Sequence, residues 1–344
     1  MTTSNSLSLP RGFAARLPLL VTLVAWLTLA GPAHALTLKI ATISPEGSVW
    51  MQALRTAGKR VAEETEGRVK LKFYPGGVQG DDKAVLRKMR VGSLHGGVMT
   101  VGILGQSYPD IQLYGLPLLF ENNAQLDYVR GKMDAGLLAG LEDKGFVGFG
   151  IAEIGFALAM SQSPIRSVQD VQSQKFWVPD GDVGSAKALE AFGISPIPLT
   201  IGDVLGGLQT QLIDTIAAPP VGAITLQWHT RLDYVLDVPL LYTYGLLVVS
   251  KRHFDKIDEV DQTVVRDVLG AVTATVNERS RKDHDDALAV LKQQGLEFLS
   301  PPPEAMDAFR AQATRANEKL VDDGIVSRET WQAFLEHRAA APGS

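Results

Sequence analysis

Apolar side chains recur along this chain with two alternating periods. Residues 36–42 and 69–74 place apolar and polar side chains in turn, which is the two-residue period of a strand with one buried face. Between them, Leu54, Ala57 and Val61 recur at the three- and four-residue spacing of an amphipathic helix. These alternating elements predict an α/β fold, which continues with helices at 81–92 and 124–141 and strands at 97–101 and 146–152.

The central stretch from Ser163 to Pro220 repeats this order. Two helices are expected there, between strands at 175–179, at 196–199 and one ending at Ala218. Such βαβ units predict a largely parallel sheet, and ligands of these sheets bind at the carboxyl ends of strands. We therefore expect the strand ends at 177–180 and 217–220 to face one another across a ligand cleft.

The remaining chain is mostly helical. Residues 226–234 are expected to be helical, and Tyr244–Ser250 reads as an apolar strand. Residues 261–295 predict one helix on the order of 50 Å long at about 1.5 Å per residue, long enough to bridge two lobes. Two short helices follow the proline run at 301–303, and residues 339–344 are expected to form a frayed tail.

The first 35 residues differ from the rest. Arg11 and Arg16 precede an apolar run at 17–30, and Ala33-His34-Ala35 supplies small residues at the positions that signal peptidase requires. This pattern predicts a secretory signal peptide cleaved after Ala35, with an uncleaved anchor as the alternative. We expect an exported, periplasmic protein.

Composition removes several classes of function. The net charge of -5 offers no basic surface for nucleic acid. The absence of cysteine excludes disulfides, thiolate metal sites and cysteine nucleophiles. Neither a G-x-S-x-G elbow, an H-E-x-x-H motif, a P-loop nor a complete dinucleotide fingerprint occurs. His284, within Lys282–Asp286, suggests a metal ligand, but its neighbours do not share one helix face, so a solvated surface explains them better. We expect no catalytic site, no metal and no cofactor.

Several short motifs stand together in a characteristic order and spacing: Tyr74-Pro75-Gly76 with Gly80-Asp81, Gly92-Ser93-Leu94, Leu116–Phe120, Ser163–Ser167 with Asp170, and Leu208-Gln209-Thr210 with Ile213-Asp214. In these the chain resembles the DctP-type solute-binding proteins of tripartite ATP-independent periplasmic (TRAP) transporters, over nearly the whole predicted mature chain. The resemblance implies a two-lobed periplasmic-binding-protein fold of the type II kind, with crossing strands and a long bridging helix. It also implies that the lobes close on one solute, which a membrane permease then takes up with an ion gradient.

On this basis we expect a first lobe of residues 36–158 and 246–283, a second lobe of 159–245 and 284–338, and a flexible tail at 339–344. A monomer is expected. One alternative keeps the fold but makes the protein a ligand sensor that presents its closed state to a receptor kinase. The other, an enzyme on the same scaffold, lacks a catalytic constellation.

The sequence departs from the family where the ligand would be held. Family members that bind organic acids carry an arginine at the position of Trp177, a second basic residue at that of Ala157 and an asparagine at that of Ala218. Burial of a carboxylate without such partners would cost several kcal/mol. The departures predict an uncharged, partly apolar or cationic ligand, with a carboxylate held by Lys175, Arg231 or backbone amides as the alternative.

An aromatic box made of Trp177, Trp228, Trp50 and Tyr244 is the site we expect for such a ligand, because aromatic faces attract cations and apolar groups. The alternative for Trp50 is a place in the core, and Asp180 and Asp182 would alternatively cap the helix that begins near Val183. The full set of expected ligand contacts is Trp177, Asp180, Asp182, Ala157, Ala218, Pro219, Trp228, Tyr244, Thr100, Trp50 and Glu46.

Overall fold

Two long antiparallel strands, β4 (Phe146–Ser161) and β8 (Tyr234–Ser250), pair with each other along most of their length. The second half of β8 pairs with β3 (Gly96–Thr100), and β1 (Leu36–Thr42) and β2 (Val69–Tyr74) follow in parallel. The end of β4 pairs with β7 (Thr215–Ala218), and the start of β8 with β9 (Glu297–Leu299). The strands thus cross between two groups of shorter strands, as a two-lobed fold requires. This computed structural model describes residues 1–2 and 35–342.

The main sheet is mixed, so the expectation of a largely parallel sheet is wrong. β4 and β8 run in opposite directions because the chain passes from one lobe to the other and returns, and β4 is also antiparallel to β7. Parallel pairing is kept within β2-β1-β3, between β8 and β9, and in a second, small sheet of β5 (Trp177–Pro179) and β6 (Ile197–Leu199).

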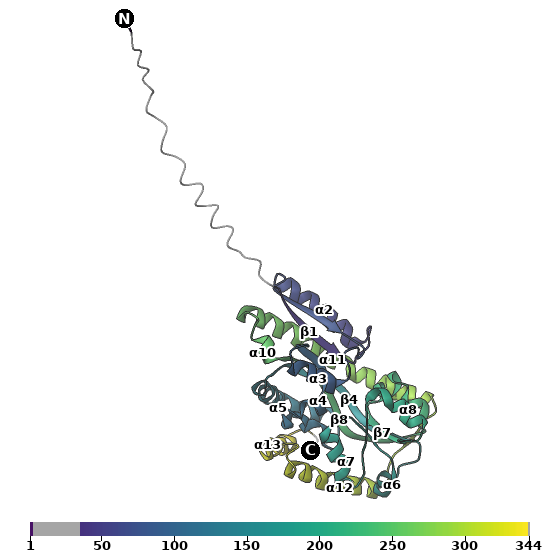
Figure 1. The fold of residues 1–344 in the computed structure, drawn as a ribbon. Coiled ribbons are helices and arrows are strands. Elements are labelled where there is room, and N and C mark those ends of the chain that lie inside the picture. The colour runs from purple at the N-terminus through teal and green to yellow at the C-terminus, as the bar shows by residue number, and fades with distance from the viewer. Residues whose placement is uncertain (3–34, 343–344) are drawn as a thin grey trace. The chain divides into compact units, whose positions relative to one another are not determined.

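Helices cover both faces of the main sheet (Figure 1). Several begin with a side-chain cap: Ser48, Asp81, Asn122 and Ser167, for example, each accept a hydrogen bond from the backbone N–H three residues on. In chain order they are α2 (Val49–Glu64), α3 (Asp82–Arg90), α4 (Val101–Leu104), η1 (Pro109–Gly115), α5 (Asn123–Asp143), α6 (Val168–Ser173), α7 (Val183–Ala191), η2 (Ile201–Asp203), α8 (Val204–Gln209), α9 (Pro220–Thr225), η3 (Trp228–Arg231), α10 (Lys251–Phe254), α11 (Glu259–Gln293), α12 (Pro303–Asp322) and α13 (Arg328–Ala339).

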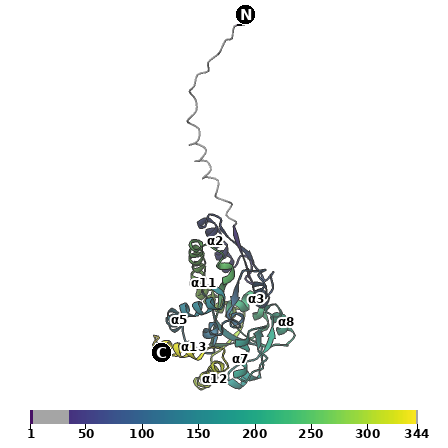
Figure 2. The ribbon, with the colours of Figure 1, turned by 60° about the vertical axis from the view of Figure 1, so that its left-hand side comes forward.

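Alternation along the strands separates the cores. Leu38 and Ile40 of β1 join one cluster with α2 and the first half of α11, whereas Ala41 joins another on the opposite face with α3 and α5. Helices α2 and α11 lie side by side in both views (Figure 2). Toward its other end, α11 contributes Leu291 to a third cluster, with β7 and α8. The 35-residue helix therefore bridges both lobes, as predicted.

Three local expectations differ from the structure. Residues 226–234 hold only the short η3, because Gln227 adopts a left-handed conformation (φ 59°) and β8 already begins at Tyr234. The helix α12 is not short but 20 residues long. Helix α13 packs against α5, so this part of the predicted second lobe lies with the first. Ala341 in the predicted tail is 6% exposed, and residues 343–344 lie outside the described range.

Candidate functional site

Family members that bind organic acids hold the carboxylate with residues at three positions, which are Ala157, Trp177 and Ala218 in this chain. We call these the clamp positions, and they lie on neighbouring strands. Ala157 is on β4, whose next residue, Leu158, pairs with Ala218 of β7. A bridge from Phe176 to Thr215 sets β5, which carries Trp177, beside β7 on its other edge. The strand ends at 177–180 and 217–220 are therefore side by side, and the expectation that they face one another across a cleft is wrong.

All three clamp positions are apolar and buried. The exposed fractions are 0% for Ala157, 3% for Ala218 and 6% for Trp177. Trp177 lies edge-to-face on Trp228, with ring centroids 5.1 Å apart, and its Nε1–H donates to the Leu199 carbonyl at 3.0 Å. Both indoles belong to the cluster around β7 and α8. An aromatic pair of this geometry contributes about 0.5–1.5 kcal/mol beyond its burial.

The other two members of the expected aromatic box lie elsewhere. Trp50 packs against the cluster of α2 and α11, which agrees with its alternative place in the core. Tyr244 lies in the cluster on the opposite face of the sheet, where its hydroxyl donates to the Ile111 carbonyl. Desolvation by burial raises its pKa well above the ordinary value. A four-membered box is therefore not formed, because the sheet separates these side chains; Trp177 and Trp228 alone come together.

The loop between β5 and α7 contacts the first lobe. Asp182 caps α7, as the alternative held, and accepts hydrogen bonds from the Ser185 N–H and hydroxyl. Burial raises the pKa of the Asp182 carboxyl. Asp180 instead forms a 3.0 Å ion pair with Lys83 of α3. A Cβ built on Gly102 of α4 would lie 2.2 Å from the Asp182 carboxyl carbon, so the two lobes meet closely here.

The remaining expected contacts are scattered. At the end of β3, the N–H and hydroxyl of Thr100 both donate to the Asp82 carboxylate at 2.8 Å, and burial raises the pKa of that carboxyl. The exposed Glu46 pairs with Arg55 at 2.8 Å, and this hydrogen bond lowers the pKa of Glu46. Pro219 is the N-cap of α9.

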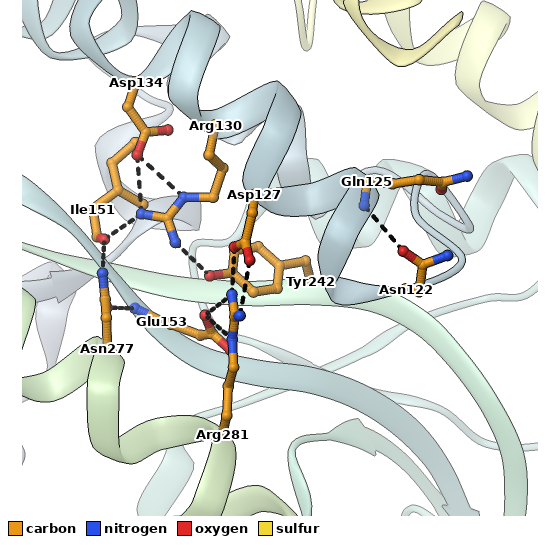
Figure 3. A network of polar contacts seen from close by, with 10 residues as sticks. All are labelled: Asn122, Gln125, Asp127, Arg130, Asp134, Ile151, Glu153, Tyr242, Asn277 and Arg281. Carbon is orange, nitrogen blue, oxygen red and sulfur yellow. Dashed lines mark hydrogen bonds and ion pairs between the residues drawn. The ribbon is translucent and has the colours of Figure 1, made fainter. Parts of the chain in front are cut away.

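A polar network that the sequence analysis missed lies where β4 has no neighbouring strand (Figure 3). Asn277 of α11 accepts from the Glu153 N–H at 2.6 Å and donates to the Ile151 carbonyl at 3.2 Å. Arg130 of α5 also donates to Ile151 and pairs with Asp134. These side chains supply the hydrogen bonds that an adjacent strand would otherwise make.

Charged side chains extend the same network. Arg281 pairs with Glu153 and Asp127, and the Ser280 hydroxyl donates to the Glu153 carbonyl at 2.6 Å. A hollow of about 700 Å³ opens between α5 and α11 over these groups. One sequence feature could have predicted this network. It is a row of polar residues on α11 at helical spacing, namely Thr273, Asn277, Ser280, Arg281 and His284.

Residues 1–2 and 35–342 contain no candidate metal site and no candidate membrane span. No group of three or more His, Cys, Asp or Glu side chains there is placed to hold a metal ion. In the same residues, every helix is too short or too polar to span a bilayer.

Comparison with known proteins gave consistent matches. Residues 40–323 match the model of DctP, described as bacterial extracellular solute-binding protein, family 7. The sialic acid-binding periplasmic protein SiaP of Vibrio cholerae is 22% identical over 313 residues, 89% of this chain and 96% of that protein. Two crystal structures of TRAP periplasmic solute-binding proteins share the fold. One, from Desulfovibrio salexigens with bound orotic acid, has a TM-score of 0.79 at 21% identity, covering 89% of this chain and 99% of the other. The second, from Sulfitobacter sp. with bound β-D-galacturonate, has a TM-score of 0.78 at 22% identity, covering 88% and 99%.

Proposed function

Because this chain belongs to bacterial extracellular solute-binding protein family 7, we propose that it is the solute-binding subunit of a TRAP transporter. In this role it captures a small solute between its lobes and delivers it to the membrane permease. Closure is a shift of the population toward the ligand-bound, closed arrangement.

The ligand we propose is uncharged, partly apolar or cationic, and the clamp positions carry this inference. Trp177 and Ala218 lie in one buried cluster and Ala157 is buried on the adjoining strand, so none of the three positions offers a carboxylate a charged partner. An unpaired carboxylate in such surroundings would cost several kcal/mol. Arg130 and Arg281, at the edge of β4 that β7 continues, are already paired with carboxylates of described residues.

The ligands recorded for similar proteins differ in charge from the ligand that we propose. Sialic acid, orotic acid and galacturonate, which the names of three similar proteins record, are all acids. A fixed guanidinium fork suits such ligands because it binds a carboxylate through two parallel hydrogen bonds. The aromatic pair of Trp177 and Trp228 offers instead apolar area and a π face.

A thermal-shift screen of the exported protein tests the ligand class. The library should contain dicarboxylates, sugar acids, 2-oxo acids, sugars, amines and aromatic compounds. A ligand at a hundred times its dissociation constant stabilises the folded state by roughly 2.7 kcal/mol, a shift of a few degrees. Hits among neutral, aromatic or cationic compounds support the proposal. Hits confined to carboxylates that Trp177→Phe and Trp228→Phe leave unchanged would overturn it.

A matched control separates ligand contact from stability. Trp331 is also a buried indole with one hydrogen bond, to Glu318, but it lies in the cluster around α5. Trp331→Phe should lower stability without changing the affinity for a hit. Trp228→Phe should change that affinity, since it alters the aromatic pair.

Export is the second part of the proposal. The family is extracellular by description, and the predicted signal peptide accounts for passage across the inner membrane. Mass spectrometry of the protein released from the periplasm should give Leu36 as the first residue. A mass that retains residues 1–35 would support the uncleaved anchor instead.

A further inference from the structure

Two histidines stack on one another at the end of the sheet opposite to the carboxyl ends of β1 and β3. The rings of His95, which precedes β3, and His253 of α10 have centroids 4.2 Å apart and planes 15° from parallel. His95 is fixed by the backbone, since its N–H donates to the Lys39 carbonyl at 2.8 Å and its own carbonyl accepts from Ser250. Its Nδ1 lies 3.0 Å from the Thr37 carbonyl oxygen.

His253 carries an unpaired polar atom. The residue is 7% exposed, and its Nδ1 has no hydrogen-bond partner among the described residues. Buried polar atoms are normally paired, so an unpaired one calls for an explanation such as a missing ion or ligand. Beside the ring, Gly92 (φ 77°) has no side chain, and a Cβ there would lie 3.0 Å from Arg252 Nη2 and 3.6 Å from His253 Cε1. The Arg252 guanidinium and the His253 imidazole therefore both lie directly beside Gly92.

Positive charges surround the pair. Desolvation lowers the pKa of His95, and Lys39, Lys256 and Arg252 lower it further. Desolvation, His95, Lys256 and Arg252 together lower the pKa of His253 to about 4. The charged groups that affect the pKa of either ring from β1, the loop before β3 and the segment around α10 are therefore all cationic. No carboxylate of a described residue is among these groups.

The cations lack counter-charges. None of Lys39, Arg252 and Lys256 forms an ion pair with a described residue, whereas the neighbouring Lys251 is paired with Asp255 at 2.8 Å. Lys39 also lies in register with Lys72 of β2, so a further cation adjoins the group. Charges of one sign gathered around this imidazole pair create a local potential that attracts counter-ions.

We propose that His95, His253, Lys39, Arg252 and Lys256 form a binding site for a phosphate-type anion, separate from the solute site. The Arg252 fork can take two oxygens of a tetrahedral anion, and the two lysines supply point charges. A metal ion does not fit, because the three cations repel it. Inorganic phosphate and a phospholipid headgroup offer the same chemistry, and the two sources can be distinguished.

The test follows the histidine Cε1–H resonances of the exported protein by NMR across a pH series. One series contains chloride buffer, a second inorganic phosphate, and a third vesicles that contain phosphatidylglycerol. A bound anion should raise the pKa of His253 by at least about one unit, because an opposite charge nearby favours the protonated ring. The resonances of His229 and His337, which lie elsewhere, should have the same chemical shifts in all three series at any one pH.

Substitutions of the cationic residues test whether these side chains form the anion site. Arg252→Gln with Lys256→Gln should abolish the shift, while Lys59→Gln, an exposed lysine of α2, should keep it. A shift with phosphate identifies a free anion, and one with vesicles alone identifies a headgroup; both support the site. No shift in either series, or a shift that persists in the double variant, would overturn it.

Discussion

Trp177 stands at a position where the resemblance implies arginine, and the surrounding residues have adapted to an indole. Its ring packs on Trp228 and its N–H is satisfied by the Leu199 carbonyl. Trp177→Phe keeps most of the packing but loses the hydrogen bond, so we expect a loss of about 1 kcal/mol in the free energy of unfolding. Trp177→Ala should lose about 3–5 kcal/mol because a cavity remains. Urea unfolding monitored by circular dichroism measures both, and equal losses would contradict this account of the indole.

His253 makes stability depend on pH. Its pKa is about 4 in the folded protein and near 6.5 when unfolded, so protonation favours the unfolded chain. The contribution of neutral His253 is complete above about pH 6.5 and is lost as the pH falls toward 4. His253→Phe keeps a ring against His95 and should flatten the stability profile between these values. The measurement is urea unfolding at several pH values in a buffer without phosphate, with His337→Phe, at a half-buried position of α13, as control.

Residue roles that depend on local sequence could be predicted. Asp182 was recognised as a possible cap because an N-cap needs only the helix that follows it. Tyr244 was not placed correctly, because its surroundings depend on which face of β8 it occupies. That face is set by pairing with β3 and β4, which are distant in sequence.

At the scale of elements, the free edge of β4 is joined to α11 by side chains rather than by a strand. Asn277→Ala would leave the buried Glu153 N–H without its acceptor, while Ile151 would keep Arg130. We expect a loss of about 1–3 kcal/mol in the free energy of unfolding, since an unpaired buried donor keeps its desolvation penalty. Urea unfolding measures the loss, and hydrogen exchange of the Glu153 amide should become faster.

A neighbouring position provides the control for that prediction. Glu278 is exposed beside the same hollow, and Glu278→Ala should change stability by no more than about 0.5 kcal/mol. Unaltered exchange of the Glu153 amide in Asn277→Ala would show that the helix does not protect this edge.

The sequence indicates the existence of these elements better than their extent. β4 was expected to end at Ala152 but continues to Ser161. Three bulges, including one at Gly155 (φ 123°), interrupt the alternation that marks a strand. The polar row on α11 was overlooked because its valines alone explain the helix, and the edge it covers exists only in the folded sheet.

For the whole molecule, the two-lobed fold was predictable mainly from the resemblance, since order and spacing of motifs carry information over the full chain. Periodicity alone indicated α/β structure but a parallel sheet, because it does not record the direction in which a strand returns. Periodicity also does not indicate which helices the C-terminal segment packs against. α13 packs on α5, a contact between residues about 200 positions apart.

In the closure that we propose, α4 and the β5–α7 loop must approach one another closely. The Lys83–Asp180 pair across this contact is exposed and is worth at most about 1 kcal/mol. Gly102 matters more, because the Asp182 carboxyl beside it is held by Ser185 and cannot easily move away. Gly102→Ala should therefore oppose closure by about 1–3 kcal/mol. At 1.4 kcal/mol per factor of ten, a ligand from the screen should bind about 5- to 140-fold more weakly.

A scattering measurement and a control substitution at another glycine distinguish an effect on lobe closure from an effect on stability. With ligand present, the Gly102→Ala protein should retain a larger radius of gyration by small-angle X-ray scattering than the unmodified protein. Gly136, within α5, has open space where a Cβ would lie, so Gly136→Ala should raise stability by about 1 kcal/mol and leave affinity unchanged. If Gly102→Ala binds as tightly as Gly136→Ala, the approach of Gly102 to Asp182 does not limit closure, and the lobes must meet the ligand through other contacts.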